Sequence, residues 1–384
     1  MKIASIISAI ESFAPPGLQE KWDNTGLQAG SPRAECTGVL LCVDVTETVV
    51  EEASERGCNL IISHHPLIFR GLKSLTGATA VERTLLAAIR AGIAIYSSHT
   101  ALDSTVGGVS YAMARMLGAK VMHVLAPAPA LMEKITVYAP RELEEDVRLM
   151  MLDLGTGIRT GAGNIPDPNR PDTASCINSY AEAVTLRSPE TSAPDPESDP
   201  DDDLYTLISH RALTRVETVV PSWQTRQILS SLSDSPLFHD LSVECTPLSN
   251  SDPGVGLGVY AVFDEPMAFE ELLDRVKTAF GTGAVRCSTT PAEIDHTITR
   301  IALCGGSGGE FIPQAIRAGA QAYITADVRY HDFVDFGKSV VLMDIGHFES
   351  ETCAKDIFYS ILTNKFPNFA VYKSELEKNP VNYL

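Results

Sequence analysis

The sequence predicts an α/β fold in which two α/β halves form one domain, with a small α+β domain inserted between them. Apolar strands alternate with helices in the first and last parts of the chain, which is typical of a parallel sheet covered on both faces. Between these parts the strands are shorter and more polar. We therefore expect the halves at residues 1–131 and 291–384 and the insert at residues 132–290.

The first half begins with MKIASIISAIESF, whose isoleucines recur at helical spacing. From Gly38 onward, the strand GVLLCVDV, the helix TETVVEEASERG and the strand NLIISHH follow one another. A further helix, ATAVERTLLAAIRAG, leads to the strand IAIYSSH. Pro66 directly follows NLIISHH, and it ends that strand because proline cannot donate a ladder hydrogen bond.

The second half repeats this alternation. The strands RIALCGG, AYITAD and SVVLMDIGH are separated by the segments GEFIPQAIRAG and YHDFVDFG. A final helix is predicted from about Glu349 to Lys365, followed by a short edge strand, FAVYKS.

The insert contains the strands KITVYAP, TRVETVVP and GLGVYAVF. It also contains SPETSAPDPESDPDDD, residues 188–203, which has no hydrophobic pattern. Such a segment cannot bury enough apolar surface to order itself, so a disordered acidic loop is predicted. A phosphorylation site or an acidic docking segment is the alternative interpretation.

Composition limits the classes of partner. The chain carries 30 Lys and Arg against 49 Asp and Glu, a net charge of -19, so a nucleic-acid partner is not expected. No apolar run reaches the ~18 residues of a membrane span, so a membrane partner is not expected either. The eight cysteines form no C-x-x-C motif and the N-terminus is a poor signal peptide, which together predict a cytoplasmic protein.

Acidic and histidine residues follow several of the predicted strands. In an open α/β sheet, ligands bind beyond the carboxyl ends of the strands. Lys and Arg are nearly absent at these positions, so a cation is needed to neutralise the cluster. The residues concerned are Asp44, His64, His65, His99, Asp103, Asp327, His331, Asp344, His347 and Glu351.

Metal ions are the cations that this pattern favours. His347 and Glu351 are four residues apart, so they share one face of a helix and can bind one centre. His64 and His65 diverge as neighbours and would serve two different ions, while Asp103 would bind terminally or bridge. Nitrogen and oxygen ligands without a thiolate suit Zn, Fe, Mn, Co or Ni rather than Ca or Mg.

Each piece of this pattern also has a purely structural interpretation. The adjacent histidines could be capping or core residues, and the His347–Glu351 pair could lie on an ordinary helix surface. Asp103 could cap the helix that follows it. What favours a metal site is that all these residues converge on strand ends.

Two other motifs allow alternatives. GGSGG, residues 305–309, matches G-x-S-x-G between a strand and a helix, so Ser307 could be a nucleophile acting with Asp327 or Asp344 and then His347. The same turn could instead hold an oxyanion or phosphate beside the metals.

The stretch KWDNTG is the second such motif. Trp22, Asp23 and Asn24 could lie at a cavity rim and contact substrate. Alternatively, Trp22 is a packing anchor and the residues after it form a turn.

Six motifs occur in order along the chain: EKWDNTGLQAG, IISHHPLIF, YSSHTALD, CGGSGGEFI, ITADVRYHDF and DIGHFESE. Together they resemble the Nif-three-like family, also labelled GTP cyclohydrolase type 2 homologues or dinuclear-metal-centre proteins. The resemblance covers nearly the whole chain, and the insert looks like the PII-like domain of the longer bacterial members. It implies a ring-shaped homohexamer whose subunits each hold two divalent metal ions, such as Zn, Fe or Mn, facing an internal cavity.

The resemblance also implies roles for individual residues. Near the metals it places His99, Asp327 and His331, which could orient ligands or transfer protons. The motif departs from the family at Ala326, where Gly is common, and the insert is more divergent. The implied metal ligands are His64, His65, Asp103, His347 and Glu351.

The sequence thus predicts a dinuclear metal-binding protein that acts as a metal-dependent hydrolase. The substrate is a small molecule that the sequence does not identify, with nucleotide-like or phosphorylated compounds as candidates. A non-enzymatic metal-binding scaffold or regulatory adaptor is the alternative, and a serine hydrolase using Ser307 is a further one.

Overall fold

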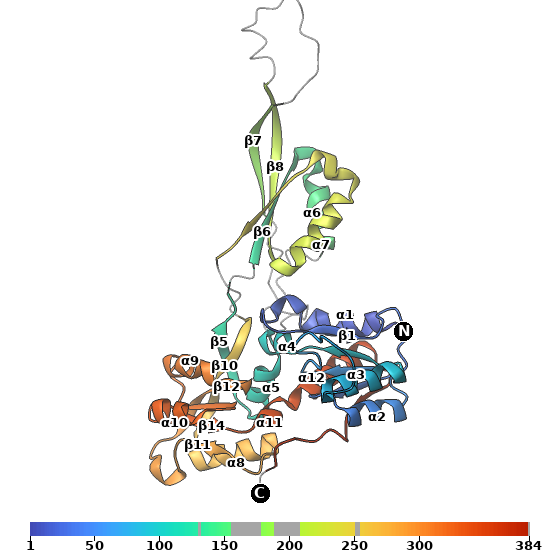
Figure 1. Cartoon of the computed structure of the whole chain (residues 1–384). Helices are drawn as coiled ribbons and strands as arrows, with labels where there is room; N and C mark the ends of the chain where they lie inside the picture. Colours follow the sequence, from blue (N-terminus) through green and yellow to red (C-terminus); the bar gives the residue numbers. More distant parts are fainter. Residues whose placement is uncertain (130–131, 155–177, 188–207, 250–253, 383–384) are drawn as a thin grey trace, which may run out of the picture. The chain divides into compact units, whose positions relative to one another are not determined.

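The structure is a computed structural model that describes residues 1–129, 132–154, 178–187, 208–249 and 254–382 (Figure 1). It divides into two compact units. The first contains residues 1–128 and 254–382, and the second contains the described residues between them.

The first unit contains a five-stranded sheet with the order β1-β4-β3-β2-β15. Strands β2, β3, β4 and β15 are parallel, and β1 pairs antiparallel with β4. The helices α2 (Glu47–Glu55) and α3 (Ala80–Ala91) are the crossovers, as the alternating pattern predicted. The strands are β1 (Gly26–Ala29), β2 (Val39–Cys42), β3 (Leu60–Ser63), β4 (Ala94–Ser97) and β15 (Val371–Lys373).

A second, six-stranded sheet in the same unit has the order β11-β14-β13-β12-β10-β5. Its centre, β12 to β14, is parallel, whereas β10 runs antiparallel to both β12 and β5. The mixed α/β fold of this unit therefore agrees with the predicted class. The strands are β5 (Lys120–Pro127), β10 (Gly256–Met267), β11 (Arg286–Cys287), β12 (Ile298–Ser307), β13 (Ala322–Ala326) and β14 (Val341–Asp344).

The main core of the first unit joins both sheets through helices packed between them (Figure 1). In α1 (Ile3–Phe13) the four isoleucines at helical spacing are all buried, and each stabilises the fold by roughly 1.5–3 kcal/mol. The other helices are α4 (Thr100–Ser104), α5 (Val109–Met116), α8 (Phe269–Phe280), α9 (Ile312–Arg317), α10 (Tyr330–Phe336), α11 (His347–Glu351) and α12 (Cys353–Lys365).

The second unit is a four-stranded antiparallel sheet with the order β7-β8-β6-β9. Two helices, α6 (Glu144–Asp153) and α7 (Ser222–Ser233), contribute apolar side chains to its core. The strands are β6 (Met132–Pro140), β7 (Asn178–Arg187), β8 (Ile208–Pro221) and β9 (Ser242–Pro247). The predicted acidic loop at 188–203 lies outside the described residues.

The structure moves the predicted end of the insert from residue 290 to about residue 252. Strand β10, which contains GLGVYAVF, lies between β5 and β12 in the second sheet of the first unit. Its polar alternation resembles that of the insert because it is an antiparallel strand with alternating burial, whereas the parallel strands β13 and β14 of the same sheet are buried throughout. The pattern thus distinguished antiparallel from parallel strands, and not one domain from another.

No helix among the described residues is both long and apolar enough to span a bilayer.

Candidate metal centre

The histidine pair is positioned by the end of β3. The amides of His64 and His65 continue the ladder by donating to the carbonyls of Cys42 and Val43, at 3.1 and 2.9 Å. Pro66 follows and ends the pairing, as expected from its missing N–H. The two imidazoles therefore stand at the carboxyl edge of the first sheet, where a parallel sheet offers its ligand site.

Residues that follow strands of both sheets complete the cluster. His347 begins α11 directly after β14, and Glu351 ends the same helix, so both face one centre as their four-residue spacing predicted. His99 and Asp103 come from the start of α4, after β4 of the first sheet. The centre is thus formed where strand ends of both sheets meet.

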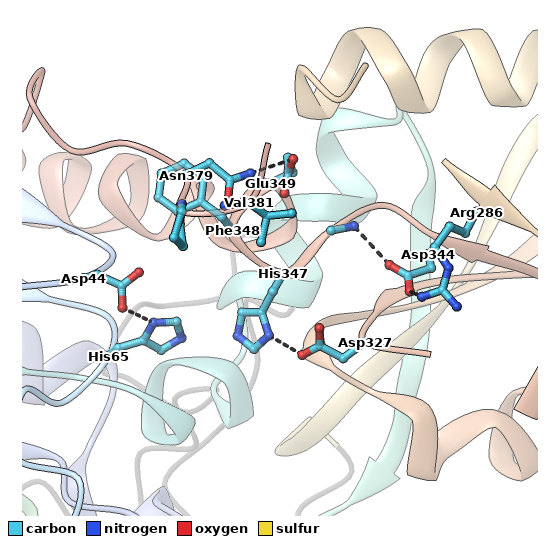
Figure 2. A pocket seen from close by; sticks show the side chains of 12 residues that line it. Asp44, His65, Arg286, Asp327, Asp344, His347, Phe348, Glu349, Asn379 and Val381 are labelled. Atoms are coloured by element: carbon cyan, nitrogen blue, oxygen red, sulfur yellow. Dashed lines mark hydrogen bonds and ion pairs between the residues drawn. The ribbon is translucent and has the colours of Figure 1, made fainter. Parts of the chain in front are cut away.

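Each histidine of the cluster has its Nδ1 atom engaged, three of them by aspartates. This arrangement fixes the ring and leaves Nε2 facing inward, which is how metal-binding histidines are commonly held. Figure 2 shows two of the pairs. The contacts are His65 Nδ1 to Asp44 Oδ1 at 2.9 Å, His99 Nδ1 to Asp23 Oδ1 at 2.8 Å, His347 Nδ1 to Asp327 Oδ2 at 2.6 Å, and His64 Nδ1 to the Ser98 carbonyl at 3.2 Å.

Three donor atoms at the centre are buried without a hydrogen-bond partner: His64 Nε2, Asp103 Oδ1 and Glu351 Oε2. His64 Nε2 lies 3.7 Å from Asp103 Oδ1 and 3.6 Å from Glu351 Oε1. Leaving such atoms unpaired costs about 1–3 kcal/mol each, more for a charged group. A cation among them would remove that cost, so these residues fit a metal ion.

Glu351 is the central carboxylate, with its side chain only 3% exposed. Its Oε2 atom lies 2.9 Å from His65 Nε2 and 3.2 Å from His347 Nε2, and neither contact has hydrogen-bond geometry. Short contacts without that geometry are what donor atoms directed at a common ion produce. Two overlapping groups bring their donor atoms within 4.8 Å: His64, His65 and His99, and also His65, His347 and Glu351. These clustered groups could hold a metal ion.

The carboxylates give the centre a strong preference for positive charge. Burial lowers the pKa of His65, but Asp44 and Glu351 outweigh it and raise the pKa to about 10. Burial also lowers the pKa of His347, but Glu351 and Asp327 raise it to about 9. The acid groups therefore favour a cation at this position, whether a proton or a metal ion.

The pKa of Asp103 is also raised, but here burial is the main cause. Burial raises the pKa of this carboxyl to about 7, with His64 opposing and the charge of Glu351 adding to the rise. Two carboxylates enclosed together repel one another, so one of them takes up a proton more readily unless a cation lies between them.

The GGSGG turn packs against Glu351, one of the candidate ligands. Gly306 has φ +60°, and a Cβ there would lie 2.2 Å from Glu351 Oε1. Its amide donates to Ser350 Oγ at 2.9 Å, and the Gly308 amide donates to Thr325 Oγ1 at 3.1 Å. These two amides are therefore not available to an oxyanion or a phosphate. Gly306 instead lets the end of β12 approach the Glu351 carboxylate closely.

The triad suggested for Ser307 has its partners engaged elsewhere. Both ring nitrogens of His347 face carboxylates, those of Asp327 and Glu351. Asp344 accepts from Arg286 at 2.9 Å and from the Val328 amide at 3.1 Å. Among the described residues no hydrogen bond joins His347 to Ser307, and His347 Nε2 is directed at Glu351 instead.

Asp327 and His331, both predicted beside the metals, have different positions. Asp327 binds His347 and has a positive φ of +54°. Aspartate and asparagine tolerate this backbone conformation better than most non-glycine residues do. His331 is exposed on α10, with its ring 5.5 Å from that of Tyr330. In the described part of the chain it belongs to neither group of converging donors.

Sequence reasoning missed a pocket of about 340 Å³ beside His65 and His347 (Figure 2). Arg286 lies in its wall, 57% exposed, and Asn379 of the C-terminal segment lines it as well. No local motif marks either residue. The GGSGG motif could have identified the role of Gly306, because a glycine run beside proposed ligands indicates close backbone approach.

The comparisons with known proteins agree over the whole chain. The sequence model of the Duf34/NIF3 (NGG1p interacting factor 3) family matches residues 1–380. The chain is 30% identical, over 100% of both sequences, to a Halalkalibacterium halodurans protein named GTP cyclohydrolase 1 type 2 homolog. A Bacillus subtilis protein of the same name is 28% identical over 99% of this chain and 98% of its own.

Solved structures show the same similarity. The crystal structure of a Bacillus cereus protein related to NIF3 matches with a TM-score of 0.79 and 28% identity, covering 100% of this chain and 99% of that one. The chain therefore belongs to the Duf34/NIF3 family.

Proposed function

We propose that this protein binds two divalent transition-metal ions per subunit and uses them to hydrolyse a small-molecule substrate. One observation carries the proposal: His64 Nε2, Asp103 Oδ1 and Glu351 Oε2 are buried at one centre without a hydrogen-bond partner. Buried polar atoms are nearly always paired, and a cation would pair all three.

The ligands we propose form two sets around a shared carboxylate. Glu351 has one oxygen beside His64 and the other between His65 and His347, so it can serve both ions. Zn, Fe or Mn suits this mixture of imidazole and carboxylate. When bound, the ions would supply Lewis acidity and an activated water for hydrolysis. The proposed ligands are His64, His65, Asp103, His347 and Glu351.

The other residues would hold and move protons. Asp23 fixes the His99 ring through Nδ1, so Nε2 of His99 is oriented to exchange a proton with a group at the centre. Asp327 fixes His347 in the same way. We assign proton transfer to His99 and not to His331, because His331 is exposed on α10, outside the converging donors.

A nucleotide-like or phosphorylated substrate is supported by two observations. Arg286 is a cation in the wall of the pocket that adjoins the metal centre, and it could contact an anionic group. The curated relatives carry the name GTP cyclohydrolase 1 type 2 homolog, which makes GTP the first substrate to test.

We also propose a homohexameric ring, a PII-like second unit and a cytoplasmic location. The α+β arrangement of the second unit, with two helices and an antiparallel sheet, supports the comparison with PII-like domains. The described cysteines are free, and most are buried, which suits a reducing compartment. Light scattering tests the hexamer by its molar mass, which should equal that of six chains of 41.4 kDa each.

The decisive experiment is metal content by plasma mass spectrometry, on protein purified without a chelator or metal-affinity tag. About two transition-metal ions per chain are expected. Glu351→Gln should lose metal, because it removes a charge at the shared ligand. Glu349→Gln is the matched control: it lies on the same helix, is also buried, and binds Asn379 outside the donor groups.

Equal metal content in the Glu351→Gln variant and the wild-type protein would contradict the assignment. If metal loads as proposed but neither GTP nor a panel of phosphorylated compounds is hydrolysed, the scaffold or adaptor function becomes the better interpretation. Buried, converging ligands would serve that function equally well.

A further inference from the structure

Two large aromatic side chains are exposed beside the metal centre. Trp22 is 58% exposed and Phe69 is 46% exposed, and their ring centroids are 5.8 Å apart with a 51° tilt. Both face His99: its ring lies 5.9 Å from that of Trp22 and 6.5 Å from that of Phe69. A Trp this exposed does not serve as a packing anchor within the chain, which favours the interpretation of KWDNTG as a cavity rim.

The loops that carry these rings are fixed to the metal centre and to each other. Asp23, next to Trp22, accepts from His99 Nδ1 and from the amide of Thr100. The neighbouring Asn24 donates through Nδ2 to the carbonyl of Ile68, which precedes Phe69. The carboxylate that orients His99 therefore also positions Trp22.

Two large aromatic rings that are exposed to water lose the stabilisation that burial would provide. Rings held in place beside a candidate site therefore suggest that a bound ligand covers them. The tilt between the rings lets a flat ligand lie face-on against one ring and edge-on against the other. Lys21 and Arg70, each adjacent in sequence to one of the rings, are exposed cations in a chain of net charge -19. These cations favour a negatively charged ligand, and the two aromatic rings favour a planar one.

We propose that Trp22 and Phe69 form a stacking subsite for a planar heteroaromatic ring of the substrate, which carries a phosphate. This inference rests on the proposed function, because the ring would be held next to the residues assigned to hydrolysis. Stacking places the scissile part of the substrate toward His99 and the ligands beyond it. The subsite contributes binding and orientation, and it does not touch the reacting atoms.

The chain offers a direct reporter. It contains two tryptophans, Trp22 and Trp223, and Trp223 lies on α7 of the second unit. Trp223→Phe therefore leaves Trp22 as a single fluorophore at the subsite. Zn-loaded protein is used, because Zn²⁺ has a filled d shell and no redox chemistry.

The single-tryptophan protein is titrated with four nucleoside monophosphates, those of adenosine, guanosine, cytidine and uridine. Ribose 5-phosphate serves as the probe without a ring. We expect saturable quenching by at least one monophosphate and none by ribose 5-phosphate. Phe69→Ala should weaken that binding about 5-fold or more, from the ~1–3 kcal/mol of a base–aromatic stack. Tyr330→Ala is the control, since Tyr330 is 73% exposed on α10 and belongs to neither donor group.

Three results would overturn the inference: no quenching by any monophosphate, equal quenching by ribose 5-phosphate, or unchanged affinity in Phe69→Ala. A change in oligomeric mass in Trp22→Ala would also overturn it, by assigning the rings to an interface between copies. Metal content is measured on the same samples. If the protein loads metal but binds none of the monophosphates, only this inference is contradicted. If the protein binds a monophosphate but takes up no metal, only the proposed function is contradicted.

Discussion

Replacing Gly306 with alanine separates backbone strain from damage to the metal centre. Gly306 has φ +60°, and the new Cβ would lie 2.2 Å from Glu351 Oε1. That oxygen is the end of a side chain, so the carboxylate can swing away. It would then leave its position 3.6 Å from His64 Nε2, where we place a shared ligand.

Gly281→Ala provides the matched control. Gly281 has φ +63°, nearly the same backbone conformation, but a Cβ there would meet nothing within 4 Å. An alanine in the left-handed region costs roughly 1–2 kcal/mol, so both variants should lose about that much free energy of unfolding. Only Gly306→Ala also displaces a proposed ligand. Because changes that merely disturb ligand orientation cost 10–100-fold in metal affinity, we expect a loss of at least about 10-fold.

The assay is a competition titration of the metal-free proteins with Zn²⁺ against a chromophoric chelator, together with urea unfolding of each variant. Weakened metal binding in Gly306→Ala, with wild-type affinity in Gly281→Ala, is the expected result. Wild-type metal affinity in Gly306→Ala would refute the reasoning that this turn is shaped to admit the Glu351 carboxylate.

Three further predictions concern carboxylates with clear partners. Asp327→Asn should lower the affinity for Zn²⁺ about 10–100-fold in the competition titration, because it frees the His347 ring that Asp327 orients. The control Asp335→Asn, at an exposed residue, should leave the affinity unchanged, and equal affinities in the two variants would argue against the orienting role. Glu377→Gln should lower the free energy of unfolding by about 3–5 kcal/mol in urea, because it leaves the Lys355 ammonium without its carboxylate while the side-chain oxygen can still accept from the two backbone amides. The control Glu375→Gln, at a side chain that is 76% exposed, should cost less than about 1 kcal/mol, and similar losses in the two variants would contradict this reasoning. Backbone amides and a hydroxyl at residues 76–78 lower the pKa of Glu82 to about 2, so its carboxylate stabilises the fold above pH 4.5 and loses that effect as the pH falls toward 2. The difference in free energy of unfolding between wild type and Glu82→Gln should therefore shrink between pH 7 and pH 3.5, and a constant difference would exclude this origin.

The sequence alone predicted most of the strands and helices of the first unit, and which residues lie at its strand ends. Uninterrupted apolar strands alternating with helices predicted parallel strands, and β2 to β4 are parallel. Strand ends then selected His64, His347 and Glu351, because the carboxyl ends of parallel strands meet at one edge. The strand directions and the clustering of these residues could be predicted because periodicity and chain direction are local properties that a sequence displays directly, whereas the role of these residues as ligands stays a prediction.

Only the tertiary structure decided which partners those residues have. Asp23 orients His99 from 76 residues away, and Gly306 admits Glu351 from a different element. The assignment of β10 to the first unit likewise depends on its pairing with β5 and β12. Such contacts join segments far apart in the chain, and no spacing or period records them, because they arise from packing whole sheets and helices against one another.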